Sequence, residues 1–172
     1  MTPGAPVIET ERLILRQHKV EDLEPYTAFM ASDRARGVGG PYGPFQAWTW
    51  FASDIAQWVL YGHGALAIEE RKTGAFAGQV SLNHLPHYPE NEIGWVAFDG
   101  FTGKGYVTEA ARAMRDFAYG TLGWSTVVSY IDRDNLASIA VAARLGATRD
   151  HDAQAPGPDD LVYRHPAPEA LP

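Results

Sequence analysis

The chain has 172 residues, of which 45% are apolar and 20% carry a charge, and its formal net charge at pH 7 is −7. This composition predicts one globular domain with a substantial core and excludes a disordered chain. The absence of cysteine excludes disulfides, thiolate zinc sites and a cysteine nucleophile. The negative charge argues against nucleic-acid binding, which needs a basic surface. It suits a cationic ligand such as an amine, although solubility alone is the simpler explanation.

The N-terminal segment has no basic start followed by an apolar stretch, and the sequence contains no run of about 18 apolar residues. We therefore expect neither a signal peptide nor a membrane partner. A cysteine-free chain fits the reducing cytoplasm. The expected organisation is a single domain over residues 1–172, with its core at about 7–164 and flexible tails at 1–6 and 166–172.

In the N-terminal half, local patterns predict a strand, two helices and a hairpin. Apolar residues between Ile8 and Leu15 predict the strand, and helices are expected over 20–31 and 44–60. A loop rich in glycine and proline separates the helices at 34–44. The apolar stripe of the second helix is expected to comprise Phe45, Trp48, Phe51, Ile55 and Trp58. Tyr42 and Trp50 lie off this stripe and are candidates for a cavity wall. Strands over 65–69 and 76–82 flank a polar turn.

In the C-terminal half, strands and helices alternate. A loop at 83–91 leads into a strand over 92–98 and then a helix over 106–119. A strand over 125–131 follows, and Asp134 is expected to cap a helix that runs to Leu145. Two last strands are expected over 147–152 and 161–164. Strands before and after helices, with hairpins at both ends, predict a mixed α/β layered sheet.

A glycine turn, TGKGYV at 102–107, joins the strand over 92–98 to the following helix. Glycines let the backbone approach an anion, and the free N–H groups of a helix start attract it. The turn is not a P-loop, because its lysine lies between two glycines. It is not a dinucleotide fingerprint either, because Thr108 stands where the third glycine is required.

This turn resembles motif A of the GNAT (general N-acetyltransferase) superfamily, Arg/Gln-x-x-Gly-x-Gly/Ala. Thr102 takes the Arg/Gln position, Gly105 the glycine position and Val107 the last small position. The departure at Thr102 removes a side-chain contact, whereas contacts from backbone amides are kept. The segments EIGW at 92–95 and GKGYVTEA at 103–110 are most similar to the branch of ribosomal-protein N-terminal acetyltransferases.

A second stretch carries the same resemblance. Asn135-x-x-Ser138, followed by ARLGA at 143–147, is similar to the family's Asn-x-x-Ser and Lys/Arg-Leu-Gly-Phe. The order of predicted elements matches the family from about Val7 to Arg164. The resemblance therefore implies a GNAT-like fold: a central mixed, mostly antiparallel twisted sheet of six to seven strands with about four helices.

The resemblance also implies a reaction and its co-substrate. The expected activity is transfer of an acetyl group from acetyl-CoA, without a metal, to a primary amine, by direct attack of that amine. The acceptor would be the N-terminal α-amine of a protein or peptide, or a small-molecule amine. Two other functions stay open: a non-catalytic acyl-CoA-binding sensor on the same fold, and a transferase for a longer acyl-CoA. Family members occur as monomers and as homodimers, and both states stay open.

The family's coenzyme contacts carry over onto matching positions. Backbone amides in a bulge of the central strand would stabilise the thioester oxygen, and they match Trp95, Val96 and Ala97. The pyrophosphate would lie on the turn and the helix start, at Gly103, Lys104, Gly105, Tyr106, Val107 and Thr108. Lys104 would add charge near the phosphates or point to solvent.

Asn135 and Ser138 share one helix face because they are three residues apart. By resemblance, Asn135 would bind the pantetheine arm. Ser138 would lie near the thioester, as a coenzyme contact or as the catalytic acid that protonates the leaving thiolate. The alternative is that Asn135 only caps its helix and Ser138 bonds its own backbone.

Glu92 is the candidate catalytic base, because a carboxylate can accept the amine proton directly or through water. Partial burial beside Trp95 would raise its pKa. The alternative is a strand-end carboxylate in solvent or in a salt bridge. Weaker candidates are Glu90, His84 and His87 as bases and Tyr163 as an acid. The histidine pair has no further spaced ligand, so a zinc site is not expected.

The acceptor groove is expected to form from residues 31–50, 83–91 and 150–160. The last segment contains the acidic residues Asp150, Asp152, Asp159 and Asp160. They would attract a cationic amine or simply face solvent. These segments are the least diagnostic in the chain, so the sequence does not name the acceptor.

Overall fold

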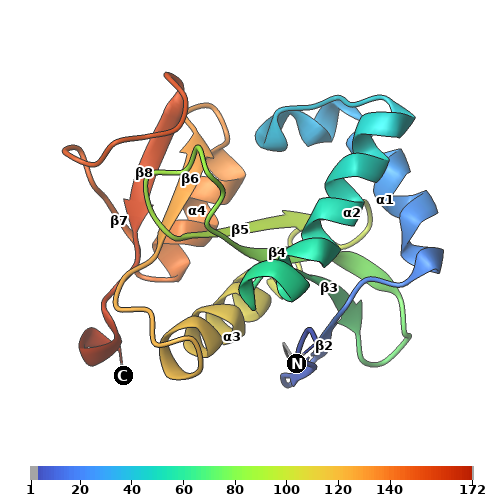
Figure 1. The fold of residues 1–172 in the computed structure, drawn as a ribbon, viewed down its shortest axis with the longest axis horizontal. Helices are drawn as coiled ribbons and strands as arrows, with labels where there is room; N and C mark the ends of the chain where they lie inside the picture. The colour runs from blue at the N-terminus through green and yellow to red at the C-terminus, as the bar shows by residue number, and fades with distance from the viewer. Residues whose placement is uncertain (1–3, 172) are drawn as a thin grey trace.

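The computed structural model describes residues 4–171, which form one eight-stranded sheet flanked by helices (Figure 1). The strands are β1 (Ile8–Glu9), β2 (Leu13–Arg16), β3 (Ala65–Glu70), β4 (Phe76–Asn83), β5 (Glu92–Ala97), β6 (Val128–Asp132), β7 (Thr148–Arg149) and β8 (Asp160–Arg164). The α-helices are α1 (Leu23–Met30), α2 (Pro44–Tyr61), α3 (Tyr106–Gly120) and α4 (Leu136–Arg144). Three short 3-10 helices are η1 (Val20–Asp22), η2 (Asp33–Val38) and η3 (Pro168–Ala170).

The mixed, mostly antiparallel sheet predicted from the sequence is confirmed. Its order is β1-β2-β3-β4-β5-β6-β8-β7, and only β5 and β6 pair in parallel. The count is eight strands in place of six to seven, because the first predicted strand is a hairpin. Its turn is closed by the backbone bond from Thr10 N to Leu13 O, at 3.0 Å.

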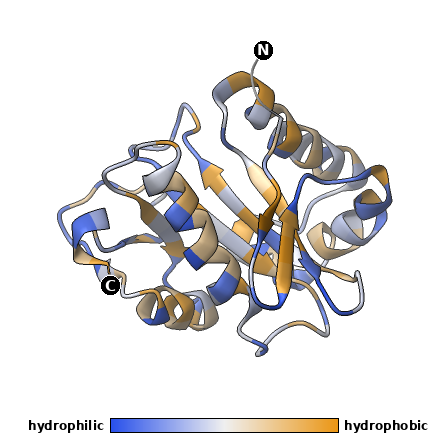
Figure 2. Ribbon diagram, turned by 90° about the horizontal axis from the view of Figure 1, so that it is seen from below, coloured by the Kyte–Doolittle hydropathy of each residue, from blue (hydrophilic) through white to orange (hydrophobic). Residues whose placement is uncertain are grey.

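Helices cover both faces of the sheet. Helix α3 packs beneath β4 and β5, whereas α1 and α2 lie together on the other side (Figure 1). Apolar residues concentrate on the strands between these helices (Figure 2). The larger core cluster, on the α3 side, includes Leu13, Leu66, Ile68, Val80, Leu82, Ile93 and Met114. A smaller cluster under α1 and α2 includes Tyr26, Phe29, Phe51 and Phe98.

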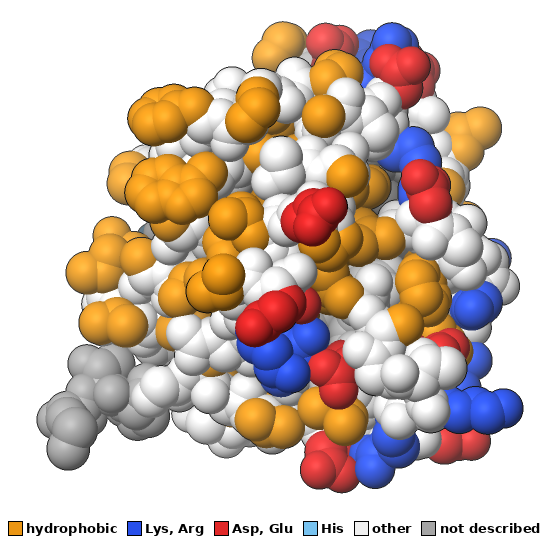
Figure 3. Space-filling view, turned by 90° about the vertical axis from the view of Figure 1, so that its right-hand side faces the viewer, with side chains coloured by type: hydrophobic (Ala, Val, Ile, Leu, Met, Phe, Trp, Pro, Cys, Tyr) orange, Lys and Arg blue, Asp and Glu red, His pale blue; other side chains and the backbone are white. Residues whose placement is uncertain are grey.

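The buried stripe of α2 differs from the one predicted. Phe51 and Trp58 are buried, but Phe45 and Trp48 are 81% and 53% exposed. Apolar side chains are also exposed on the face of the molecule that lies on the right in Figure 1 (Figure 3). The buried positions of α2 are Ala47, Phe51, Asp54, Gln57 and Trp58. Three of these buried residues, one small and two polar, lie outside the predicted stripe, because a hydrophobic pattern does not mark such residues as buried.

Two segments expected to be irregular contain short helices. The loop predicted at 34–44 begins with η2, which ends at Gly39 with a φ of 87°. Near the C-terminus, η3 forms, and the Tyr119 hydroxyl donates to Pro166 O at 2.9 Å. Residues 1–3 and 172 of the expected tails lie outside the described residues. Within residues 4–171, no helix has the length and apolarity needed to cross a membrane.

The approach of β4 to β5 depends on Gly78, which lies opposite Ala97. A Cβ atom at this position would lie 2.2 Å from Val96 O, and the φ of Gly78 is +154°. We predict that Gly78→Ala lowers the free energy of unfolding by about 3 kcal/mol, because backbone must move. Urea unfolding measures this change.

The matched control is Gly120→Ala, in the last turn of α3, where a Cβ meets nothing within 4 Å. It should be neutral or stabilising by up to about 1 kcal/mol. A Gly78→Ala variant as stable as this control would contradict the close approach.

Candidate functional site

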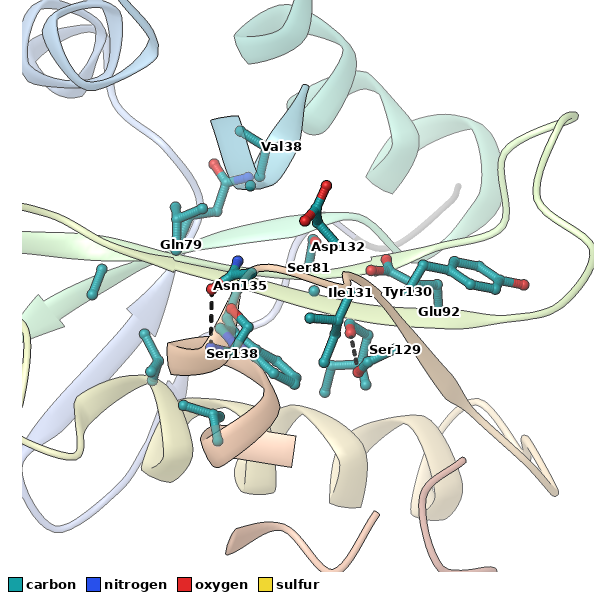
Figure 4. Close-up of a pocket in the computed structure, with 18 of the residues that line it drawn as sticks. Val38, Gln79, Ser81, Glu92, Ser129, Tyr130, Ile131, Asp132, Asn135 and Ser138 are labelled. Atoms are coloured by element: carbon teal, nitrogen blue, oxygen red, sulfur yellow. Dashed lines mark hydrogen bonds between the residues drawn. The ribbon is translucent and has the colours of Figure 1, made fainter. Parts of the chain in front are cut away.

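A cavity of about 910 Å³ lies where β5 and β6 separate (Figure 4). Of the predicted catalytic and coenzyme-binding residues, those that line it are Glu92, Trp95, Val96, Ala97, Gly103, Gly105, Tyr106, Val107, Asn135 and Ser138. Lys104 and Thr108 line a second, adjoining hollow, which shares Gly103, Gly105 and Val107 with the first. Residues from distant parts of the chain thus meet around one continuous concave region.

Strands β5 and β6 pair at a single position, Glu92 with Val128. One residue further on, the Ser129 hydroxyl donates to Ile93 O at 2.7 Å, and the strands then diverge. Beyond this point the outer edge of β5 has no partner strand among the described residues. Backbone groups on that edge therefore face the cavity.

The β4–β5 hydrogen bonds show which amides these are. Phe98 N donates to Ala77 O at 2.9 Å, and Leu82 N donates to Gly64 O, away from β5. Partner residues alternate along an antiparallel pair between hydrogen-bonded and non-bonded positions. The N–H groups of Trp95 and Ala97 therefore face the gap, whereas that of Val96 faces β4.

The bulge expected in the central strand is absent. The β4–β5 register runs without a shift from Asn83–Glu92 to Gly78–Ala97. The irregularity of this part of the sheet lies in β3, between Ile68 and Glu69. The free amides on β5 arise instead because β6 separates from β5. Only the amides of Trp95 and Ala97 face outward, whereas those of Trp95, Val96 and Ala97 were all expected to do so.

The glycine turn leads directly into α3, whose N-terminus is not capped by a side chain. Gly103 and Gly105 have φ angles of 76° and 77°, which L side chains rarely adopt. Gly105 is the N-cap of α3, and no side chain caps this end. The first N–H groups of a 15-residue helix therefore lack a capping acceptor and point, with the helix dipole, toward an anion.

Cationic side chains surround this helix start in the adjoining hollow. They are Arg12, Lys104, Arg112 and Arg144. Arg12 is fixed in place: its Nε lies 2.7 Å from Glu109 Oε2, and its NH1 donates to Lys104 O at 2.9 Å. Sequence reasoning singled out Lys104 alone as a cation of this site. Arg12 belongs to the β1–β2 turn, so only the tertiary structure brings it to the glycine turn.

Helix α4 presents Asn135 and Ser138 to the cavity (Figure 4). The N-cap is Asn135, not Asp134 as expected, and Asn135 Oδ1 accepts the Ser138 N–H at 3.1 Å. The Asp134 N–H instead donates to Asp132 Oδ1. Asn135 therefore does cap its helix, and its amide nitrogen lies against Gly37 of η2. The Ser138 hydroxyl is available to a ligand.

Glu92 is a buried carboxyl group, 6% exposed, at the bottom of the cavity. Asn83 Nδ2 donates to its Oε2 at 2.7 Å. Its Oε1 would lie 2.8 Å from a Cβ on Gly94, so the carboxyl group occupies the space that glycine leaves free. Burial raises the pKa of Glu92 to about 8, the Asn83 bond opposes this shift, and the charge of Asp54 adds to it.

The other candidates occupy distinct places. Both carboxylate oxygens of Glu90 are bound by Arg164, each at 2.8 Å, which commits Glu90 to a salt bridge. His87 lines the cavity, whereas His84 and Tyr163 do not. Both predicted wall residues, Tyr42 and Trp50, line it, as does Asp160 from the acidic loop. Lining residues that the sequence did not indicate include Tyr26, Asp54, Gln57, Gln79 and Tyr130.

Known proteins are similar to this chain in sequence and in architecture. A family model described as an acetyltransferase (GNAT) domain matches residues 12–148. The crystal structure of an acetyltransferase from Agrobacterium tumefaciens superposes with a TM-score of 0.91 at 46% identity, covering 96% of each chain.

Two proteins of Bacillus subtilis are similar in sequence. YkkB, an uncharacterised protein, is 36% identical over 50% of this chain, and the match spans about half, 51%, of its length. YoaA, an uncharacterised N-acetyltransferase, is 25% identical over 84% of each chain.

The burial of Glu92 makes a prediction for stability. Its pKa in the folded state, about 8, lies above the ordinary value of 4.5, so between these values the folded state holds a proton that the unfolded state has lost. Because the folded state binds the extra proton, the contribution of Glu92 lowers the free energy of unfolding progressively as the pH rises from about 4.5 to 8. Glu92→Gln should therefore be more stable than wild type at pH 8.5, by about 2–4 kcal/mol, and similar to it at pH 4.5.

Urea unfolding of both proteins at the two pH values measures the difference. Asp159→Asn, at an exposed carboxylate, provides a control that should show no such pH-dependent gain. Equal stability of Glu92→Gln and wild type at pH 8.5 would contradict a pKa of Glu92 raised by burial.

Proposed function

The chain belongs to the GNAT acetyltransferase family, and from this premise we propose that it transfers the acetyl group of acetyl-CoA to a primary amine. The observation that carries the proposal is the convergence, around one cavity, of three parts. These are the outward amides of β5, the uncapped start of α3 and the buried carboxyl group of Glu92. The amine attacks the thioester directly, with no covalent enzyme intermediate.

The residues present fit the charge and polarity of acetyl-CoA. The amides at the start of α3, with Gly103 and Gly105, suit a pyrophosphate, because helix starts favour anions. Arg12, Lys104, Arg112 and Arg144 line the adjoining hollow and supply positive charge for the phosphates. Asn135 and Ser138 on α4 suit the polar pantetheine arm. With the coenzyme bound in this way, its acyl end would lie in the gap between β5 and β6.

The outward amides on β5 supply the electrostatic part of catalysis. As the amine attacks, negative charge develops on the thioester oxygen, and fixed N–H donors aimed at it stabilise the transition state. Trp95 and Ala97 hold such donors on the open edge. Arg34 NH2 donates to Ala97 O at 2.7 Å, which helps to fix the end of this edge. Val96 contributes lining but not a donor.

Glu92 acts as the base. The N–C bond to the acetyl carbon forms and the C–S bond breaks. The attacking nitrogen loses one proton to Glu92, directly or through water, the leaving sulfur takes up one proton from solvent or through Ser138, and Glu92 then returns its proton to solvent. A carboxyl group with a pKa near 8 is matched to accepting a proton at neutral to slightly alkaline pH. Ser138 contacts the coenzyme or delivers the proton to sulfur.

The acceptor is an amine of a protein N-terminus or of a small molecule. The acceptor side of the cavity is lined by carboxyl groups from four elements: Asp54, Glu92, Asp132 and Asp160. Glu92, with a pKa of about 8, adds its negative charge only at alkaline pH. The arginines near its rim are paired, Arg34 with Asp99 and Arg36 with Asp33. This charge pattern favours a cationic amine over an anionic or neutral acceptor.

Acetyl-CoA should stabilise the protein strongly. At 100 times its dissociation constant a ligand adds about 2.7 kcal/mol, which corresponds to a rise in Tm of roughly 5–11 °C for a domain of this size. Thermal unfolding with acetyl-CoA, CoA, ATP and NAD measures this. A shift with acetyl-CoA and CoA alone is expected, and the absence of any shift would contradict the coenzyme site. A shift without turnover of any amine would favour the sensor over the enzyme.

Glu92→Gln should lower kcat/KM by at least about 100-fold, because it removes the base. Its Kd for acetyl-CoA should stay unchanged. In wild type, kcat/KM should rise with pH up to about 8, where Glu92 loses its proton, and this dependence should disappear in the variant. Glu90→Gln, two residues away and bound to Arg164, is the matched control and should keep most activity. An unchanged kcat/KM in Glu92→Gln would remove the base assignment.

A further inference from the structure

The part of the cavity under α2 holds a second buried carboxylate that the reaction above does not use. Asp54 is 7% exposed and lines the same cavity as Glu92. Tyr26 Oη and Gln79 Nε2 both donate to its Oδ2, at 3.3 Å and 3.0 Å. No residue among 4–171 donates to Oδ1. One oxygen of this buried group is therefore held by the protein and the other is left for a ligand.

Neighbouring groups fix the orientation of Asp54. His18 Nε2 lies 2.7 Å from Gln79 Oε1, and an amide oxygen only accepts, so His18 donates. This directs the amide nitrogen of Gln79 toward Asp54. The His18 ring is itself enclosed by the rings of Tyr26, Phe51 and Phe76. The carboxylate is thus held in one position by residues from α1, α2 and β4.

A second unsatisfied acceptor lies beside Asp54. Gln57, one helical turn further along α2, is 3% exposed and lines the cavity. Its Oε1 is buried and has no hydrogen-bond partner among the described residues. A buried acceptor without a donor is costly, and a buried carboxylate is stabilised by each further donor it receives. A ligand group with several N–H donors and a positive charge satisfies both.

The sheet sets the spacing between the two carboxylates. Gln79, Ser81 and Asn83 share one face of β4, and the Glu92 carboxyl group leans over Gly94, which pairs with Ser81. Asp54 bonds to Gln79, the next residue along the same face. Same-face neighbours on a strand are on the order of 7 Å apart, so the two carboxylates are separated by about one such step.

We propose that Asp54 and Gln57 form a binding site for a second ammonium group, and that the preferred acceptors carry two amino groups. This inference rests on the proposed transfer reaction: one amine lies at Glu92 and is acetylated, and the other is bound by α2. The spacing suits linear diamines with three to five carbons between the nitrogens. Burial raises the pKa of Asp54 to about 6, so the group is largely ionised at neutral pH.

Steady-state kinetics with acetyl-CoA, followed by thiol release, tests the inference. The acceptors are 1,4-diaminobutane and 1-aminobutane, which differ by one amino group. For wild type, kcat/KM should be at least about tenfold higher for the diamine, mainly through a lower KM. In Asp54→Asn and in Gln57→Leu this ratio should fall toward one. Asp116→Asn, which removes one charge from the exposed face of α3, should keep the wild-type ratio.

Calorimetric titration of the two amines into the CoA-bound protein separates this inference from the transfer reaction. Tighter binding of the diamine, lost in Asp54→Asn, supports the second ammonium site even if no acetylation is observed. Equal binding and equal kcat/KM for the two amines in wild type would overturn the inference and leave the transfer reaction intact. A preference for the diamine that survives in both folded α2 variants would also overturn it.

Discussion

Strands β5 and β6 separate after one ladder pair, and both sides of the cavity are built around this separation. A parallel pair that continued would bond the amides of Trp95 and Ala97 to β6 and close the gap. Ser129 ends the pairing, because its hydroxyl donates to Ile93 O in place of a backbone group. His165 Nε2 lies 2.9 Å from that hydroxyl, and burial keeps the pKa of His165 low, at about 3, so the ring is neutral. The point of divergence is thus held by buried neutral hydrogen bonds.

Two consequences follow from this gap. On the α3 side, it opens onto the uncapped helix start and four cationic side chains, of which Arg12 is paired with Glu109. On the α2 side, it opens onto the buried carboxyl groups of Glu92 and Asp54, whose desolvation raises their pKa values. The helix start and its cations suit an anionic coenzyme, and the carboxyl groups suit an amine acceptor. Glycine at position 94 leaves the space that the Glu92 carboxyl group occupies.

Much of this architecture was predictable from local pattern. The strand, glycine turn and helix over 92–119 have strong periodicity and unambiguous turn residues, and their positions agree with β5 and α3. The stripe of α2 was not predicted correctly, because Asp54 and Gln57 occupy buried positions that a hydrophobic pattern assigns to apolar residues. Arg12 was missed because its role arises from contacts with Lys104 and Glu109, more than 90 positions away in the sequence. The expected bulge was wrong because unpaired amides have a second possible origin, strand separation, that local sequence does not reveal.

The most direct test of this account is amide hydrogen exchange of β5, measured residue by residue by NMR with and without acetyl-CoA. In the free protein, the Val96 amide should exchange slowly, because it bonds to β4, whereas those of Trp95 and Ala97 should exchange faster. Acetyl-CoA should protect Trp95 or Ala97 and leave Val96 unchanged. Slow exchange at all three positions in the free protein, or no protection by acetyl-CoA, would contradict the open edge of β5 as the site of acetyl transfer.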